Sequence, residues 1–204
     1  WNADHTVSII YNGEIFNYRD LAEQENFSCK TGTDTEVLLK LYEKYGMDFI
    51  PKLRGMFAFA MYDTRSRTFH LARDPSGIKP LFIAYPEGKL HFASEMRALM
   101  TALPQKPELN MQALSQYLRL QYVPGPQTLC EGIESLPPGT VLTWTNGKEQ
   151  RQEVQPDVSA PPFTSKEEFR SSFPDLMDQI VKEHLVSDKP LRSEEHTSEL
   201  QSQF

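Results

Sequence analysis

The sequence predicts an α+β fold in which antiparallel sheets pack with helices. Between Met56 and Ala93, apolar runs typical of strands follow one another with only short turns between them, and consecutive hairpins indicate antiparallel pairing. Other segments carry apolar residues at helical spacing behind capping signals. A chain of 204 residues can bury about 70% of its unfolded surface, so it can form a substantial hydrophobic core.

The first predicted element is a buried strand at Val7–Ile10, a β-branched run. Asn12 and Gly13 follow, and both tolerate positive φ, so we expect the chain to turn sharply there. Asn17 can cap a short helix over residues 18–22. A plain hairpin turn is the alternative interpretation of Asn12-Gly13, because Asn-Gly between apolar residues is a strong hairpin signal.

A second helix is predicted to begin at Thr33, which has capping-box spacing to Glu36. Gly46 is expected to end it. The apolar face of this helix consists of Val37, Leu38, Leu41, Tyr42 and Tyr45. Asp34 lies in the first turn, where an acidic side chain complements the helix dipole. This structural role alone can account for an aspartate at position 34.

Most of the remaining elements are predicted strands joined by turns. They are the candidate strand at 27–29, the strands at 56–62, 68–72, 81–85, 90–93 and 141–144, and a returning strand after Asn146-Gly147. Residues 74–77 and 86–88 are predicted turns. A capped helix is predicted to begin near Ser94, and Asn110 is predicted to cap a helix over 111–120 with Leu114, Tyr117 and Leu118 on one face.

Composition narrows the class of protein. The net charge is −7, without a basic cluster, which argues against nucleic acid as a partner. No apolar run approaches the ~20 residues of a membrane span, and no signal peptide opens the chain. Cys29 and Cys130 make no disulfide framework, which fits a cytoplasmic protein. Cys29 is expected to be a small buried apolar residue. The histidines show no metal-ligand spacing, so we expect no metal site.

Asn12 and Gly13 also carry a functional hypothesis. The Asn12 side-chain amide and the Gly13 N–H can both point at one anionic oxygen, which is how an oxyanion hole is built. A helix start close behind a polar segment at the end of a strand suits the binding of a small polar molecule. The residues alone leave this hypothesis and the plain turn as alternatives.

The run Tyr11-Asn12-Gly13-Glu14-Ile15-Phe16-Asn17-Tyr18 resembles the signature of class II glutamine amidotransferase domains, and most closely the asparagine synthetase branch. The resemblance extends from Asn2 to about Leu191. It implies the N-terminal-nucleophile hydrolase fold, a four-layer αββα sandwich. It also implies that Asn12 and Gly13 form the oxyanion hole, and that these two residues and Glu14 bind the substrate glutamine.

Further segments resemble this family. Gly32–Glu36 is similar to its second glutamine-binding segment, which implies that Asp34 pairs with the α-ammonium of glutamine. Ala72–Leu81 is similar to a segment shared with phosphoribosyl amidotransferases, and Ser94–Leu99 and Ile133–Thr140 resemble the synthetase branch. For Arg73, Asp74 and Lys79 in the first of these, a structural ion pair and turn is preferred to a catalytic role.

The resemblance and the composition together divide the chain. Residues 1–155 are expected to be an N-terminally truncated glutaminase domain, followed by a polar linker at 156–164. Residues 165–191 are expected to open an ATP-dependent synthetase domain. Ser165 and Glu168 form a capping box there, Phe169, Phe173, Leu176, Ile180 and Leu185 lie near one face, and Pro174 should kink or break the helix. Residues 192–204 are interpreted as an artefactual tail joined to a truncated gene, with a natural polar tail as the alternative.

For the parent protein the resemblance implies two reactions. An N-terminal Cys thiolate releases ammonia from glutamine, and a synthetase domain uses ATP and Mg²⁺ to convert aspartate to asparagine through an acyl-adenylate. A homodimer is also considered. The nucleophile and an upstream Arg that holds the glutamine carboxylate are missing from residues 1–204, so this fragment is expected to be inactive and to bind no ATP or Mg²⁺. The alternatives are a related enzyme that amidates or cyclises another acid, such as a β-lactam synthetase or a peptide amidotransferase, and a binding module without catalysis.

Overall fold

The computed structural model describes residues 1–156 and 163–186. The chain divides into two compact units, residues 1–157 and 158–204. Most of the expected linker, and all of the expected tail at 192–204, lie outside the described residues. The predicted division at residues 156–164 remains a proposal.

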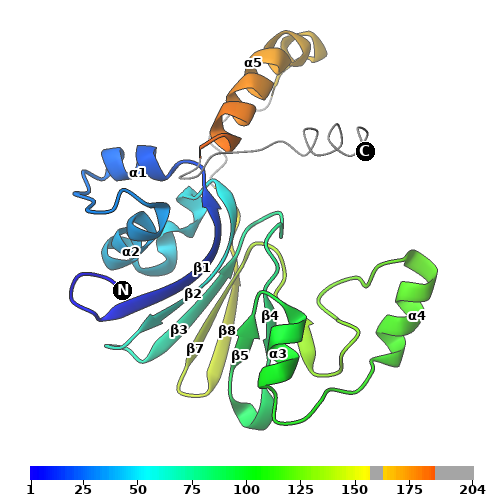
Figure 1. The fold of residues 1–204 in the computed structure, drawn as a ribbon. Coiled ribbons are helices and arrows are strands. Elements are labelled where there is room, and N and C mark those ends of the chain that lie inside the picture. Colours follow the sequence, from blue (N-terminus) through cyan, green and yellow to red (C-terminus); the bar gives the residue numbers. More distant parts are fainter. Residues whose placement is uncertain (157–162, 187–204) are drawn as a thin grey trace, which may run out of the picture. The chain divides into compact units, whose positions relative to one another are not determined.

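Two antiparallel sheets form the centre of the first unit (Figure 1). The larger sheet has the strand order β1-β2-β3-β7-β8. Its strands are β1 Val7–Ile15, β2 Gly55–Asp63, β3 Thr68–Arg73, β7 Thr140–Thr145 and β8 Lys148–Glu153. The smaller sheet has the order β5-β4-β6, with β4 Phe82–Ala84, β5 His91–Ala93 and β6 Ile133–Ser135. The predicted antiparallel pairing is confirmed.

The alternation of β2 explains why it lies between two other layers. Ala58 and Ala60 belong to a buried cluster with residues of the smaller sheet's side, including Leu81 and Ile83. Phe59, which points to the opposite face, stacks on Phe49 at 6.4 Å between ring centroids. Small side chains let the two sheets approach each other, and large ones fill the space under the helices. Both faces of the strand are therefore buried.

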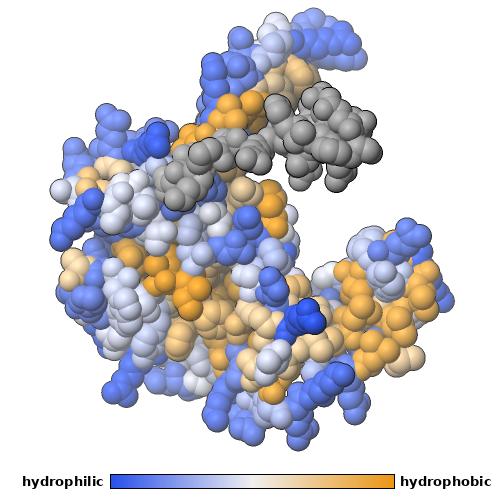
Figure 2. Space-filling view, in the orientation of Figure 1, coloured by the Kyte–Doolittle hydropathy of each residue, from blue (hydrophilic) through white to orange (hydrophobic). Residues whose placement is uncertain are grey.

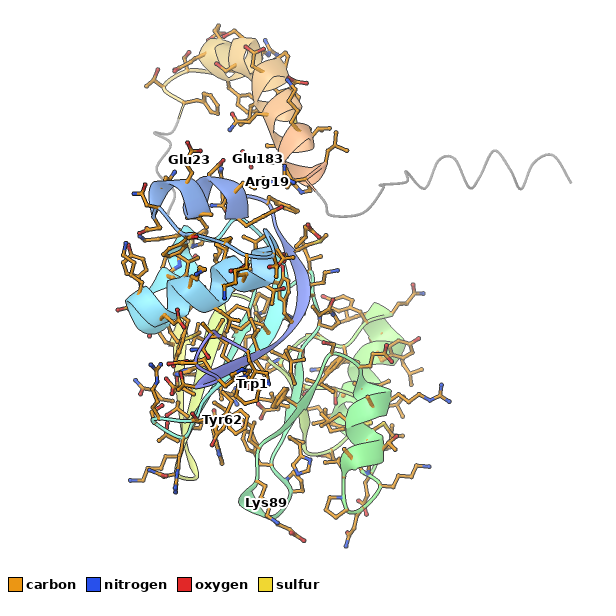
Figure 3. All side chains as sticks on the ribbon, turned by 60° about the vertical axis from the view of Figure 1, so that its left-hand side comes forward. Trp1, Arg19, Glu23, Tyr62, Lys89 and Glu183 are labelled. Carbon is orange, nitrogen blue, oxygen red and sulfur yellow. The ribbon has the colours of Figure 1, made fainter. Side chains whose placement is uncertain are left out.

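Helices lie on the outer sides of both sheets. They are α1 Tyr18–Gln24, α2 Asp34–Tyr45, the 3₁₀ helices η1 Gly46–Lys52 and η2 Pro86–Gly88, α3 Met96–Ala102 and α4 Met111–Leu120. Figures 1 and 3 show α1 and α2 on the side of the larger sheet, and α3 and α4 on the side of the smaller one. Leu99 of α3 packs with Ala84 and Ile133. The expected fold, an αββα sandwich with antiparallel sheets, is confirmed.

Several capping predictions are confirmed. The Thr33 side chain accepts from the Glu36 N–H at 3.4 Å, and Asn110 accepts from the Ala113 N–H at 3.0 Å. The Glu36 carboxylate departs from a standard capping box, because it accepts from the N–H groups of Lys30 and Thr31. It therefore ties the preceding loop to the helix.

The sharp turn expected at Asn12-Gly13 is wrong. β1 continues through both residues, with Asn12 opposite Ala58 and Gly13 opposite Phe57, and neither has positive φ. The strand is also less buried than predicted, since Ile10 is 71% exposed. The long partner strand β2 offers a ladder along the whole segment, and this tertiary pairing outweighs the local turn preference of Asn-Gly.

Three smaller predictions are also wrong. Residues 27–29 form no strand. Asn17 is the N-cap of α1 without a side-chain capping bond. Its amide instead donates to the Lys52 carbonyl and accepts from the Arg54 N–H, both at 2.9 Å. The helix near Ser94 has Glu95 as its N-cap, also without a side-chain capping bond. The Asn17 amide therefore bonds to backbone groups far away in sequence instead of the first N–H groups of α1.

The apolar side of α4 is exposed. Leu118 is 73% exposed and Met111 67%, and Figure 2 shows hydrophobic side chains gathered over this helix. The helix itself forms where predicted, and its internal periodicity gave no indication of whether its apolar face would be covered.

The described part of the second unit is the single helix α5 Lys166–His184. Ser165 accepts from the Glu168 N–H at 3.1 Å, which confirms the predicted cap. The helix continues through Pro174 without a break. Its apolar side chains, including Phe169 and Phe173, are exposed in the described structure.

Candidate functional site

The candidate site lies along β1. Because side chains alternate along a strand, Tyr11, Gly13 and Ile15 share one face, and Asn12 and Glu14 share the other. The Tyr11 hydroxyl reaches Asp34 at the start of α2, so the first of these faces is the one that meets the helix. The structure therefore places Asn12 and Glu14 on one face of β1, and Asp34 lies at the edge of this strand on the side of Tyr11.

Gly13 is required by close approach. A Cβ built on it would lie 2.3 Å from the Met56 carbonyl oxygen and 2.8 Å from the Phe57 Cα. Any side chain would therefore push β1 away from β2. The glycine was predicted for its conformational freedom, but the structure uses it for its lack of a side chain.

The Gly13 N–H points to the open edge of the sheet. Opposite Gly13, Phe57 turns its backbone groups toward Asp74: the Asp74 N–H donates to the Phe57 carbonyl at 2.8 Å, and the Phe57 N–H donates to Asp74 Oδ2 at 3.3 Å. Gly13 and Phe57 thus form a non-hydrogen-bonded pair, whose backbone groups face away from each other. Since β1 is an edge strand of the larger sheet among the described residues, the Gly13 N–H faces outward.

Asp34 occupies the same edge two residues farther along. Its Oδ2 accepts from the Ile15 N–H at 3.3 Å and from the Tyr11 hydroxyl at 2.7 Å, and its Oδ1 accepts from the Thr35 hydroxyl at 3.3 Å. The N–H groups of Gly13 and Ile15 are about 7 Å apart along the strand. A backbone N–H group and the Asp34 carboxylate therefore lie along the same edge of the sheet.

The Asp34 carboxylate is buried without a counter-ion. Asp34 is 8% exposed, its three donors are all neutral, and within the described residues no Lys or Arg forms an ion pair with it. A buried charge normally requires a paired charge or a full set of hydrogen bonds. This carboxylate can therefore accept a cationic ligand group.

Tyr11 was absent from the residues assigned to the site by sequence reasoning. Burial, together with the hydrogen bond to Asp34, raises the pKa of the Tyr11 phenol above its ordinary range, so the hydroxyl remains a proton donor. Tyr11 immediately precedes Asn12 in the motif, but no local pattern shows that its hydroxyl reaches a helix start 23 residues away.

Asp74 is a structural residue, as predicted, but the predicted ion pair is replaced by backbone contacts. The carboxylate is fully buried. It accepts four N–H groups, from Phe57, Ser76, Ile78 and Lys79, at 3.0–3.3 Å. Lys79 contributes through its backbone.

Arg73 links the two sheets. Its guanidinium donates to the carbonyls of Gly77, Lys79 and Leu136 and to the Ser135 hydroxyl. Burial lowers its pKa from the ordinary value. These contacts satisfy the guanidinium with neutral acceptors from β6 and the 74–79 turn, which supports a structural role.

The cysteines lie elsewhere. Cys29 is half-buried, against the expected full burial, and burial together with Glu36 raises the pKa of its thiol. The Cys130 thiol lies 3.8 Å from the Met100 sulfur. Among the described residues no group of side chains could hold a metal ion. No helix in the same part of the chain has both the length and the apolar character needed to cross a membrane.

A separate cleft of about 940 Å³ lies between the smaller sheet and residues 103–110. Its lining includes Tyr85, Lys106, Gln127 and Cys130, and none of Asn12, Gly13, Glu14 or Asp34. This cleft and the motif residues therefore lie in different places. The motif edge is the better candidate, because it holds the buried unpaired carboxylate.

Comparison with known proteins matches residues 1–155 to the glutamine amidotransferase domain family. Asparagine synthetase [glutamine-hydrolyzing] 1 of Bacillus subtilis is 36% identical over 207 residues, covering 93% of this chain, and asparagine synthetase B of Escherichia coli is 33% identical over 198 residues. The chain spans 30% of the length of either protein. A solved structure of the allosteric regulatory enzyme of purine biosynthesis aligns over 72% of this chain and 28% of its own, with 23% identity and a TM-score of 0.49.

Proposed function

The chain belongs to the glutamine amidotransferase domain family, and from this premise we propose that the open edge of β1 binds glutamine for hydrolysis. Glutamine carries an amide carbonyl at one end and an α-ammonium at the other, separated by a short carbon chain. Along this edge the Gly13 N–H would supply an oxyanion donor and the Asp34 carboxylate an anion for the ammonium. The observation that carries the proposal is the buried Asp34 carboxylate, whose donors are all neutral.

Each site residue has a distinct part in this proposal. The Gly13 N–H and the Asn12 side-chain amide stabilise the negative oxygen that develops as the amide carbon is attacked. Glu14, on the same face as Asn12, helps to hold the substrate. Asp34 binds the α-ammonium, which restores electrical neutrality at a buried site.

For the parent protein we propose glutamine-dependent synthesis of asparagine, because its relatives carry that name over matching segments. Aspartate and ATP with Mg²⁺ would then bind in a synthetase region that begins near α5. No described residues form a cluster suited to Mg²⁺, and residues 1–204 contain no glycine-rich phosphate loop. We therefore assign neither ATP nor Mg²⁺ to any residue of this chain.

Calorimetric titration of residues 1–204 with glutamine tests the binding proposal. We expect glutamine to bind more tightly than glutaramate, which has the same amide and carboxylate but no α-ammonium. The difference arises because only glutamine can neutralise Asp34. Failure of the chain to bind glutamine, or equal affinity for both ligands, would contradict the proposal.

The hydrolytic step requires a nucleophile that residues 1–204 do not supply, since Cys29 and Cys130 both lie inside the chain. We expect this polypeptide to release no ammonia from glutamine. A version joined to the Cys-initiated segment of the Bacillus subtilis relative should release it.

In that version Asn12→Ala should lower kcat roughly 10²–10³-fold if its amide is an oxyanion donor. Ammonia release by the shorter polypeptide at a similar rate would overturn the mechanism.

A further inference from the structure

We propose that Tyr11 is a positioning residue that fixes the Asp34 carboxylate for recognition of the ligand's α-ammonium. The inference rests on the proposed glutamine site and deepens it. The Tyr11 hydroxyl donates to Asp34 Oδ2 at 2.7 Å, the shortest of the three contacts of that carboxylate.

The hydroxyl and the Ile15 N–H bind the same oxygen of Asp34. Oδ2 accepts from both groups, while Oδ1 accepts only from the Thr35 hydroxyl at 3.3 Å. An ionised carboxylate has about four acceptor positions. Two donors on one oxygen fix the orientation of the carboxylate and leave acceptor capacity on the other oxygen for an ammonium N–H.

The neutrality of Tyr11 is the important property. A Lys or Arg in its place would form an ion pair with Asp34 and compete with the ligand's cation. A phenol whose pKa is raised by burial and by Asp34 donates a hydrogen bond without neutralising the carboxylate. The site is thus ordered before the ligand arrives, and its charge remains available.

Tyr11 also connects the two ends of the site. Its backbone is in β1, next to Asn12 and two residues from Gly13, while its side chain reaches the first residue of α2. Any shift of α2 along β1 would break the hydrogen bond. The separation of oxyanion donor and carboxylate is therefore held by this contact together with the Asp34 contact to the Ile15 N–H.

The test is calorimetric titration of residues 1–204 and of Tyr11→Phe with glutamine and with glutaramate. The substitution keeps the ring and removes the hydroxyl. We expect glutamine affinity to fall roughly tenfold, as for the loss of one hydrogen bond to a charged group, and glutaramate affinity to stay within about twofold. Tyr45→Phe is the matched control, because it removes a phenol–carboxylate hydrogen bond to Glu25 away from the site, and it should leave both affinities unchanged.

The double variant Tyr11→Phe/Asp34→Asn distinguishes a positioning role of Tyr11 from a purely structural one. In that background the ammonium partner is already lost, so Tyr11→Phe should have no further effect on glutamine affinity. Three results would overturn the role of Tyr11 while leaving the glutamine site in place. They are an equal loss of affinity for both ligands, the same loss of glutamine affinity in the Asp34→Asn background, and no loss of affinity at all. Absence of glutamine binding by the unaltered chain would instead overturn the proposed function, and this inference with it.

Discussion

Asp34 and Asp74 are both buried aspartates in the first unit, and their surroundings differ in one decisive respect. Asp74 receives four backbone N–H groups, enough to occupy the acceptor positions of a carboxylate. Asp34 receives three neutral donors, two of them on a single oxygen. The first carboxylate is satisfied by the fold, and the second retains capacity for a ligand. Similar burial therefore accompanies a structural role in one case and a proposed binding role in the other.

The largest effect that we expect is the loss of folding stability in Asp74→Ala, which removes the satisfied carboxylate. The variant leaves four N–H groups without their acceptor, and a buried unsatisfied donor costs about 1–3 kcal/mol. We expect a loss on the order of 5 kcal/mol, comparable with the whole stability of a marginal domain. Urea unfolding followed by circular dichroism measures it. Asp48→Ala is the control, because Asp48 is exposed, and a loss no greater than that of the control would contradict the structural role.

The next largest effect that we expect is the loss of glutamine affinity in Asp34→Asn. The amide keeps an acceptor oxygen for Tyr11 and Ile15 but removes the charge, so folding stability should change little. Glutamine affinity should fall roughly 10²-fold or more, since an ammonium left unpaired at a partly buried site loses about 3–5 kcal/mol. Titration calorimetry gives the affinity. In an enzyme completed with a nucleophile and a synthetase domain, glutamine-dependent activity should fall far more than ammonia-dependent activity.

Unchanged glutamine affinity in Asp34→Asn would show that Asp34 only begins a helix, as any first-turn acid can. Equal loss of glutamine-dependent and ammonia-dependent activity would have the same meaning.

The same contrast shows what the sequence could predict. The ligands of Asp74 come mainly from the turn that follows it, and the turn residues Asp74–Gly77 were predicted as such. Two of the three contacts of Asp34 come from β1, 19 and 23 residues away. Local patterns identified the helix start, the hairpins and the Asn110 cap. They could not identify Tyr11, because nothing in the spacing of the residues shows which strand a helix start will meet.

The error at Asn12-Gly13 has the same origin. Local propensity favoured a turn, whereas nine residues of β1 pair with β2. The resemblance that implies the site residues does not depend on the turn. Their chemistry could therefore be proposed although the local conformation was predicted wrongly.

Gly13→Ala tests the structural basis of that correction. The added methyl would lie 2.3 Å from the Met56 carbonyl oxygen, so β1 and β2 must separate, and we expect a loss of about 2–3 kcal/mol. Urea unfolding measures it. Gly125→Ala is the matched control, because a Cβ there meets nothing within 4 Å. Equal stability of the two variants would show that the strands adjust freely and that Gly13 is not required by close approach.

The smallest expected effect concerns Asp63, a buried aspartate that, unlike Asp34, forms an ion pair with an arginine. Arg65 donates to both of its carboxylate oxygens, at 3.0 and 2.8 Å. The Arg65 hydrogen bonds lower the pKa of Asp63 from 3.8 to about 2. Because the folded-state pKa is depressed, the stabilisation is fully present above the unfolded-state pKa. It is lost as the pH falls through the folded-state value.

We therefore expect Arg65→Gln to cost about 1–2 kcal/mol at pH 7, a figure that allows for solvent screening of the half-exposed arginine. The cost should shrink as the pH falls from about 4 to 2, because protonation of Asp63 removes the interaction in the unaltered chain as well. Urea unfolding at several pH values measures this difference, with Arg119→Gln on α4 as the control. A cost that stays constant down to pH 2 would mean that Arg65 acts through packing, and the distinction between a paired and an unpaired buried aspartate would then lose its electrostatic basis.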